Sequence, residues 1–213
     1  MRLPPFRTGF LRQLKLEGAR VTLRPMRSKD WRQWSRLRAT SRHFLTPWEP
    51  IWPADALTRG AYRQRLKISD TEGRGGHGYT LHIFRREDEA LMGAITLTHI
   101  RRGVAQMGTL GYWIGEPYAR QGYMTEALEL VARFAFRDLG LHRLEAACLP
   151  GNQPSQRLLR RLGFREEGLA RSYLRIDGQW ADHLLFARLS DDVPLRLASS
   201  NDEPKQVTVG TDR

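Results

Sequence analysis

The stretch LGYWIGEPYARQGYMTEALELV, residues 110–131, carries the spacing in this chain that is most suggestive of chemistry. A short apolar run reaches a turn marked by glycine and proline, and a helical pattern begins directly after Gly122. A strand that enters a helix through glycine leaves several backbone N–H groups unpaired beside the positive end of the helix dipole. Such a turn can bind a phosphate group, although a lone glycine can also serve only to make the turn tight.

Two familiar phosphate-binding motifs do not fit this turn. A dinucleotide-binding fold requires G-x-G-x-x-G after its first strand, whereas the segment RQGYMT has one glycine and follows four predicted strands. A P-loop requires G-K-[ST], which the sequence does not contain. The turn at Gly122 therefore belongs to neither class.

Histidine and cysteine show no spacing typical of a metal site or of a paired nucleophile. The six histidines and the single cysteine show no C-x-x-C or H-x-x-x-H spacing, so no metal site is expected. Cys148 lies within an apolar strand pattern and is interpreted as an inert core residue. Acyl transfer through this cysteine would need a paired histidine, which the sequence does not place.

The elements that must position these residues alternate between strand and helix patterns. The pattern predicts a first strand at 19–26, a helix at 31–45, a proline-rich loop at 46–53, a second helix at about 54–68 and a glycine-rich loop at 70–78. Strands follow at 79–86, 91–100, 107–114 and 142–149, with a helix from 123 to Gly140, a short helix ending at Gly163, and a hairpin that turns at Asp177-Gly178. The fold class is therefore mixed α/β, with a central antiparallel meander and a parallel strand–helix–strand unit around Gly122.

Length and composition indicate one globular domain. With 213 residues, 40% of them hydrophobic and 27% charged, the chain is large enough for a single core. We expect a basic segment at 1–18, the domain at 19–189, and a polar, aperiodic, disordered tail at 190–213. No apolar run approaches the ~18 residues of a membrane helix, and no secretory signal pattern opens the chain. The single cysteine fits a reducing compartment, so a cytoplasmic protein is expected.

The charge is strongly positive. The formal net charge is +12, and only four of the 35 basic residues are lysines. A basic field favours anionic partners such as nucleic acid, a ribosome surface or a phosphorylated cofactor. The arginines are scattered rather than clustered, however, and an arginine-rich composition spread over a solvated surface explains them equally well.

Beyond these patterns, the chain resembles the GNAT acetyltransferase superfamily, and within it the branch of ribosomal-protein-alanine N-acetyltransferases. Four segments carry the resemblance: RHFLTPWEP (42–50), LGYWIGEPYARQGYMTEAL (110–128), HRLEAACLPGNQPSQRLLRRLGF (142–164) and EGLARSYLRIDGQWADH (167–183). The resemblance covers roughly residues 19–189 and implies a GNAT-like fold. It implies acetyl-CoA as co-substrate, with its pyrophosphate at the Gly122 turn.

The resemblance also implies the residues of the site. The cofactor-binding set is Trp113, Ile114, Arg120, Gln121, Gly122, Tyr123, Met124, Thr125 and Asn152. Ala119 stands where the family loop usually has glutamine or arginine, so backbone N–H groups are expected to hold the phosphates. Ser155 is the expected proton donor to the departing thiolate, and Asn152 is expected to bind the pantetheine amides. Both residues could instead serve only as helix caps.

The expected base is Glu49, in the proline-rich loop, although it could also be a solvated loop carboxylate. The expected reaction is transfer of acetyl to the N-terminal α-amine of a protein, with a ribosomal protein as partner and possible association with the ribosome. One alternative is acetylation of a small amine such as a polyamine or an aminoglycoside. Another alternative is a ribosome- or RNA-binding factor that has lost its activity.

Overall fold

The computed structural model describes residues 10–192. One eight-stranded mixed sheet organises this part of the chain, in the order β1-β2-β3-β4-β5-β6-β8-β7. The strands are β1 (Leu16–Glu17), β2 (Val21–Pro25), β3 (Tyr79–Arg85), β4 (Leu91–Arg101), β5 (Met107–Ile114), β6 (Arg143–Cys148), β7 (Arg165–Ile176) and β8 (Gln179–Leu189). The helices and helical turns are α1 (Phe10–Gln13), η1 (Ser28–Asp30), α2 (Trp31–Thr40), α3 (Arg42–Leu45), η2 (Thr46–Trp48), α4 (Arg59–Gly75), η3 (Glu116–Tyr118), α5 (Tyr123–Arg133), the π-helical turn η4 (Phe134–Asp138) and α6 (Gln153–Arg161).

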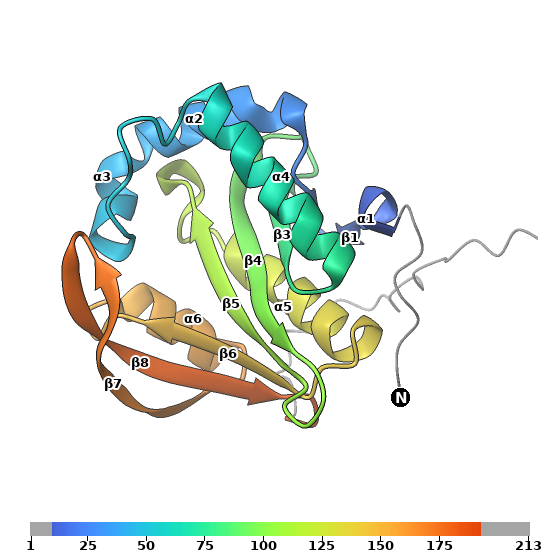
Figure 1. Ribbon diagram of the computed structural model, residues 1–213, viewed down its shortest axis with the longest axis vertical. Helices are drawn as coiled ribbons and strands as arrows, with labels where there is room; N and C mark the ends of the chain where they lie inside the picture. The colour runs from blue at the N-terminus through green and yellow to red at the C-terminus, as the bar shows by residue number, and fades with distance from the viewer. Residues whose placement is uncertain (1–9, 193–213) are drawn as a thin grey trace, which may run out of the picture.

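The predicted strand arrangement is confirmed. Strands β3, β4 and β5 form the antiparallel meander, and β5 pairs with β6 in parallel through α5. The β7–β8 hairpin closes the sheet with β7 at its edge. In Figure 1, α4 lies in front of the sheet, and α5 and α6 lie behind it. We name these sides the α4 face and the α5 face.

The α5 face holds the larger core. Alternation along β5 and β6 turns Leu110 and Leu144 toward this face, where Leu128 and Val131 of α5 meet them. All four side chains are buried. The apolar stripe of α5 is therefore what seats the start of this helix beside the C-terminal end of β5.

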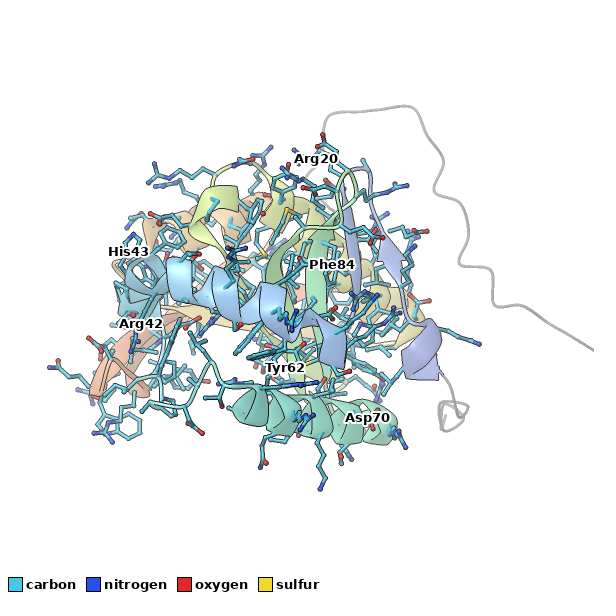
Figure 2. All side chains as sticks on the ribbon, turned by 90° about the horizontal axis from the view of Figure 1, so that it is seen from above. Arg20, Arg42, His43, Tyr62, Asp70 and Phe84 are labelled. Carbon is cyan, nitrogen blue, oxygen red and sulfur yellow. The ribbon has the colours of Figure 1, made fainter. Side chains whose placement is uncertain are left out.

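The α4 face has a smaller core with polar groups inside it. Trp34 and Leu37 of α2 and Tyr62 of α4 pack with Phe84 and Leu91 from the sheet. Figure 2 shows Tyr62 between α2 and α4, with Arg20 on the opposite side of the sheet. Asp30 and His82 are almost fully buried near this cluster.

Two helix predictions on the α4 face were wrong in their bounds. The second helix runs from Arg59 to Gly75 instead of 54–68, so most of the predicted glycine-rich loop is helical. The Thr58 side chain caps its start, and Gly76, with φ 69°, ends it. Gly73 packs against Leu11, whose Cδ2 would lie 2.7 Å from a Cβ at this position.

The predicted helix 31–45 divides at Ser41, which separates α2 from α3. The Ser41 hydroxyl is buried and accepts a hydrogen bond from the Glu116 N–H. The break therefore ties the start of the proline-rich loop to the segment that follows β5.

The N-terminal part of the described chain joins the sheet. Leu14 and Leu16, from the segment predicted to precede the domain, are buried in the core of the α5 face, and β1 pairs with β2. Residues 1–9 and 193–213, which include most of the predicted tail, lie outside the described residues. The bounds 19–189 remain a prediction.

Candidate active site

Strands β5 and β6 part beside the Gly122 turn. Their parallel register runs only from Met107↔Arg143 to Leu110↔Ala146. Beyond that point β5 continues along β4 as far as Ile114, and β6 continues along β8 as far as Cys148. The two strand ends therefore separate where α5 and α6 both begin.

The start of α5 has the geometry expected of a phosphate-binding turn. Gly122 is the N-cap residue with φ 82°, and Arg120 also has a positive φ of 62°. The first backbone bond at this end runs from the Glu126 N–H to the Gly122 carbonyl. Among the described residues, no protein acceptor meets the N–H groups of residues 123–125. These N–H groups and the helix dipole suit an anion.

A side chain at position 122 would disturb this turn. A Cβ built on Gly122 would lie 3.1 Å from an Arg20 guanidinium nitrogen, and the positive φ would strain any other residue. The bare backbone thus fits a diphosphate that must approach it closely.

Arg20 also lies at the turn, a position that no sequence pattern predicted. Its guanidinium donates to the Gln121 carbonyl at 3.0 Å and to the Glu126 carboxylate at 3.1 Å, and it stacks 4.9 Å from the Tyr123 ring centroid. A depression of about 420 Å³ next to it is lined by Arg20, Arg85, Arg86 and Tyr123, among others. No local signal could have revealed this residue, because 106 positions separate it from Glu126.

The other side chains of the loop differ in their contacts and in their exposure. Gln121 donates to the Pro117 carbonyl at 2.7 Å. Met124 is buried in the core, so only its backbone can face a cofactor. Arg120 is exposed, while Thr125 is partly buried. The loop therefore offers mainly backbone groups, as expected from the sequence.

At the start of α6, Asn152 and Ser155 have separate tasks. The Asn152 side-chain oxygen accepts from the Ser155 N–H at 3.1 Å, so Asn152 is the helix cap. Its side-chain NH₂ and the Ser155 hydroxyl are not used for capping. The Ser155 hydroxyl instead lies 2.7 Å from the Tyr112 hydroxyl of β5.

Burial keeps the neighbours of Ser155 protonated. Desolvation raises the pKa of the Tyr112 phenol far above its ordinary value, against the opposing effect of the Ser155 hydrogen bond. Desolvation also raises the pKa of the Cys148 thiol, again opposed by a hydrogen bond with Ser155. The buried cysteine is therefore a thiol rather than a reactive thiolate.

Trp113 and Ile114 point to opposite faces. Ile114 packs against the core of the α5 face, whereas Trp113 packs with the cluster of the α4 face. The Arg38 guanidinium lies 4.7 Å from a Trp113 ring centroid and 4.1 Å from one of Trp52. Trp113 thus connects the parted strands with the proline-rich loop.

Glu49 is held by this arginine. Arg38 donates to both carboxylate oxygens, at 2.8 and 2.6 Å, and the Trp52 indole N–H donates to one of them at 2.7 Å. The Glu49 carbonyl accepts from the Asp177 N–H at the β7–β8 turn. Glu49 therefore joins α2, which packs on the α4 face, to the proline-rich loop and the hairpin, whereas Ser155 belongs to α6, which lies behind the sheet (Figure 1).

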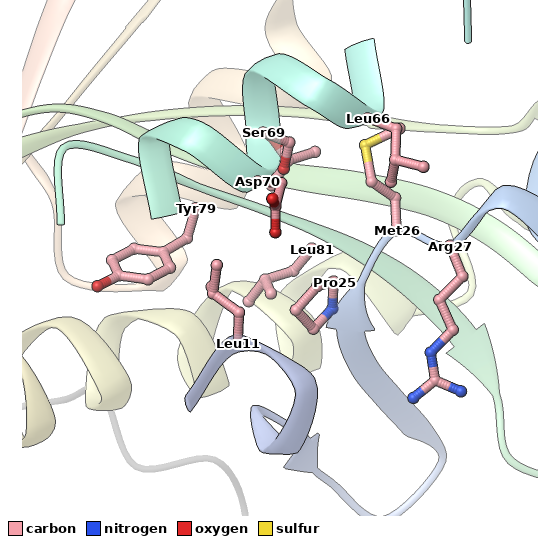
Figure 3. A pocket seen from close by; sticks show the side chains of 10 residues that line it. Leu11, Pro25, Met26, Arg27, Leu66, Ser69, Asp70, Tyr79 and Leu81 are labelled. Carbon is pink, nitrogen blue, oxygen red and sulfur yellow. The ribbon is translucent and has the colours of Figure 1, made fainter. Parts of the chain in front are cut away.

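A second pocket lies away from these residues. Its volume is about 390 Å³, and it is lined by Pro25, Leu66, Asp70 and Tyr79, among others. Figure 3 shows it between α4, α1 and the end of β2. Because Arg20 at the other end of β2 reaches the Gly122 turn, this pocket lies at the opposite end of the sheet from that turn.

Within residues 10–192, no three side chains of His, Cys, Asp and Glu gather as metal ligands would. The same residues include no helix that is long and apolar enough to cross a membrane.

The comparisons with known proteins agree with this geometry. Residues 20–165 match the acetyltransferase (GNAT) domain. "Probable N-acetyltransferase YjcK" of Bacillus subtilis is 34% identical over 177 residues, which are 83% of this chain and 98% of that protein. The "[Ribosomal protein uS5]-alanine N-acetyltransferase" of Escherichia coli is 33% identical over 180 residues, 84% of this chain and 93% of that protein. "Mycobacterium smegmatis RimJ in complex with CoA-disulfide" is 34% identical with a TM-score of 0.78, covering 82% of this chain and 84% of that one.

The matched region contains the parted strands, the Gly122 turn and Ser155, so the predicted fold class and co-substrate are confirmed. The chain belongs to the GNAT acetyltransferase family and is an acetyl-CoA-dependent N-acetyltransferase.

Proposed function

We propose that the enzyme acetylates the N-terminal α-amine of a protein, and that this protein is a ribosomal protein. The observation that carries the proposal is the parting of β5 and β6 between the Gly122 turn on one face and the Glu49 loop on the other. A cofactor bound at the turn and an acceptor arriving from the loop would meet between the strand ends. The name of the relative in Escherichia coli supports a ribosomal acceptor.

Acetylation of an α-amine does not require a strong general base close to the amine. An α-amine with a pKa near 8 is roughly 10% neutral at pH 7, whereas a lysine amine near 10.4 is less than ~0.1% neutral. An α-amine can therefore react with only a distant base acting through water. This suits a site whose candidate base, Glu49, already accepts hydrogen bonds on both oxygens.

Each residue of the site has a role in this proposal. The N–H groups at Gly122 and the first turn of α5 hold the pyrophosphate, with Arg20 beside them. The Asn152 side-chain NH₂ donates to a pantetheine carbonyl. Backbone N–H groups near Trp113 and Ile114 stabilise the oxyanion, and the Ser155 hydroxyl donates to the departing sulfur.

The role of Glu49 in this proposal is to fix the proline-rich loop to α2 and to the β7–β8 turn. The general-base role expected from the sequence stays a prediction. Substitution by glutamine tests it, because the amide keeps the size of the side chain and removes its basicity.

The proposed acceptor is tested by a substrate screen. Short peptides that begin with alanine or serine, the same peptides with a blocked α-amine and a free lysine, and spermidine are each incubated with acetyl-CoA and analysed by mass spectrometry. We expect a single acetyl group on the free α-amine. Faster acetylation of spermidine or of the lysine would contradict the proposal and favour a small-amine enzyme.

We further propose that the basic surface brings the enzyme to the ribosome. The net charge of +12 makes such binding salt-dependent. Cosedimentation with ribosomes should be strong at about 50 mM salt and weak at about 300 mM. Absence of binding at both concentrations would mean that the charge reflects composition alone.

A further inference from the structure

We propose that Tyr112 is a positioning residue for acetyl transfer, holding the Ser155 hydroxyl so that the serine hydrogen is directed at the departing sulfur. This inference rests on the role given to Ser155 in the proposed function. It adds a residue of β5 to a task otherwise assigned to α6 alone.

The contact joins two elements far apart in sequence. Alternation along β5 places Tyr112 on the same side as Leu110 and Ile114, toward α5 and α6. Its hydroxyl reaches the Ser155 hydroxyl at 2.7 Å across 43 residues of sequence. Both side chains are only partly buried, and both lie where β5 and β6 part.

Either hydroxyl could be the donor in this contact, and we assign that role to the phenol. The phenol keeps its proton at neutral pH, because the ordinary pKa of tyrosine is near 10 and burial raises it further. Among the described residues, Ser155 is the side-chain partner of the Tyr112 hydroxyl. We therefore take the phenol as the donor and the Ser155 oxygen as the acceptor. The neighbouring Cys148 also stays protonated, and a thiol is a weak acceptor.

The Ser155 hydrogen is therefore left for a third group. Capping does not use it, because the Asn152 oxygen accepts from the Ser155 backbone N–H instead. A serine hydroxyl rotates freely unless a neighbour fixes it. Tyr112 supplies that neighbour before the substrates bind, and a preorganised donor costs no reorganisation when charge develops.

Ser155 acts at the moment of bond exchange. It donates a hydrogen bond to the sulfur as the C–S bond breaks and the new C–N bond forms. The proton lost by the amine nitrogen balances the proton gained by the thiolate. Tyr112 touches neither substrate in this account.

The experiment compares Tyr112→Phe, Ser155→Ala and the double variant. The first readout is the pKa of the thiol of bound coenzyme A, from the thiolate absorbance as pH is raised. The second is the rate of the chemical step in a single turnover with an acetylated peptide from the screen. Tyr62→Phe is the matched control, because it removes a hydroxyl that bonds the Arg27 carbonyl on the α4 face.

We expect Tyr112→Phe and Ser155→Ala each to raise the pKa of the coenzyme A thiol by about one unit. A change of this size corresponds to the loss of one hydrogen bond to the thiolate. Each should slow the chemical step roughly tenfold, with the affinity for coenzyme A little changed. The double variant should match Ser155→Ala alone, because Tyr112 acts only through the serine. Tyr62→Phe should alter neither readout. A 3-fluorotyrosine at position 112, which keeps the hydroxyl, should restore both.

Two results would overturn the inference while leaving the proposed function intact. One is a Tyr112→Phe enzyme that equals the wild type while Ser155→Ala is impaired. The other is a double variant whose losses are the sum of the two single losses. If Ser155→Ala changes neither readout, the role of Ser155 in the proposed function fails, and the role of Tyr112 fails with it.

Discussion

The two faces of the sheet place their functional groups by different means. On the α5 face, the Gly122 turn and the cap at Asn152 are made mostly of backbone groups and short polar side chains. On the α4 face, positions depend on largely buried ion pairs between residues close in sequence. Asp30 is buried against Arg24, which donates to both of its oxygens at 2.7 and 2.8 Å, and Glu49 is held by Arg38.

This difference suggests how each face should respond to mutation. Backbone groups on the α5 face keep their places as long as the glycine and the caps remain. Each ion pair on the α4 face depends on both partners, because removal of one leaves a poorly solvated charge. We therefore expect binding defects from changes on the α5 face, and stability or acceptor defects from changes on the α4 face.

The largest effect should come from Asp30→Ala. It leaves the Arg24 guanidinium, which is 14% exposed, without its carboxylate, at a cost of about 3–5 kcal/mol in unfolding free energy. Urea denaturation measures this loss. Coenzyme A binding by the folded protein should persist, because Asp30 lies on the α4 face.

Asp88→Ala is the matched control, since Arg85 holds Asp88 in a similar pair on the surface. It should change stability little, because solvent screens an exposed pair. Equal losses of unfolding free energy in the two variants would show that burial does not make the Asp30 pair more important for stability than an exposed pair.

Gly122→Trp should abolish coenzyme A binding while the protein remains folded. The side chain would occupy the space beside the N–H groups and meet Arg20, so the dissociation constant should rise at least about a hundredfold, roughly 2.7 kcal/mol. Calorimetry measures binding, and circular dichroism checks the fold.

Gly140→Trp is the control at the other end of the same helical segment, where φ is 63° and no neighbouring atom lies within 4 Å of the position a Cβ would take. It carries a similar backbone strain and should bind coenzyme A normally. Retained binding in the Gly122 variant would refute the phosphate-binding turn.

Glu49→Gln should weaken binding of the acceptor peptide more than it slows the chemical step. An amide presents an NH₂ group to donors of Arg38 or Trp52, which loosens the proline-rich loop. The peptide KM should rise about tenfold, roughly 1.4 kcal/mol, with kcat within about threefold. Glu89→Gln, an exposed glutamate, is the control. A hundredfold fall in kcat with an altered pH profile would instead identify Glu49 as the base.

The smallest effect concerns pH. Burial lowers the pKa of His82, although the Asp30 carboxylate 3.7 Å away acts in the opposite direction. The unfolded chain binds a proton near pH 6.5 that the folded protein resists, so unfolding free energy falls as pH drops from about 7 to about 5. The slope from this residue is at most about 1.4 kcal/mol per pH unit. His82→Gln should flatten it in thermal melts, whereas exposed His43→Gln should not.

The sequence predicted the α5 face better than the α4 face, for physical reasons. Gly122, Asn152 and the alternation along β5 are local signals, and they predicted the turn, the cap and the parallel unit. Tyr112 could also have been found, because alternation assigns it to the face opposite Trp113. The contacts of Arg20 with Glu126, and of Arg38 with Glu49, are set by packing and carry no local pattern.

The helix bounds on the α4 face show the same limit. Glycines at 73 and 75 indicated a loop, yet α4 extends through both, and Gly73 lies in close contact with the Leu11 side chain. Propensity at a single residue was outweighed by a tertiary contact that could not be known in advance.

The strand order has a consequence for how the chain folds. Strands β3, β4 and β5 are neighbours both in sequence and in the sheet, joined by residues 86–90 and 102–106, so closing their connections costs little entropy. Pairing of β2 with β3 must instead close residues 26–78, and pairing of β5 with β6 must close residues 115–142. We therefore expect the meander to be structured early in refolding. The opening between the ends of β5 and β6, where acetyl transfer takes place, would then form late, when β6 docks on β5.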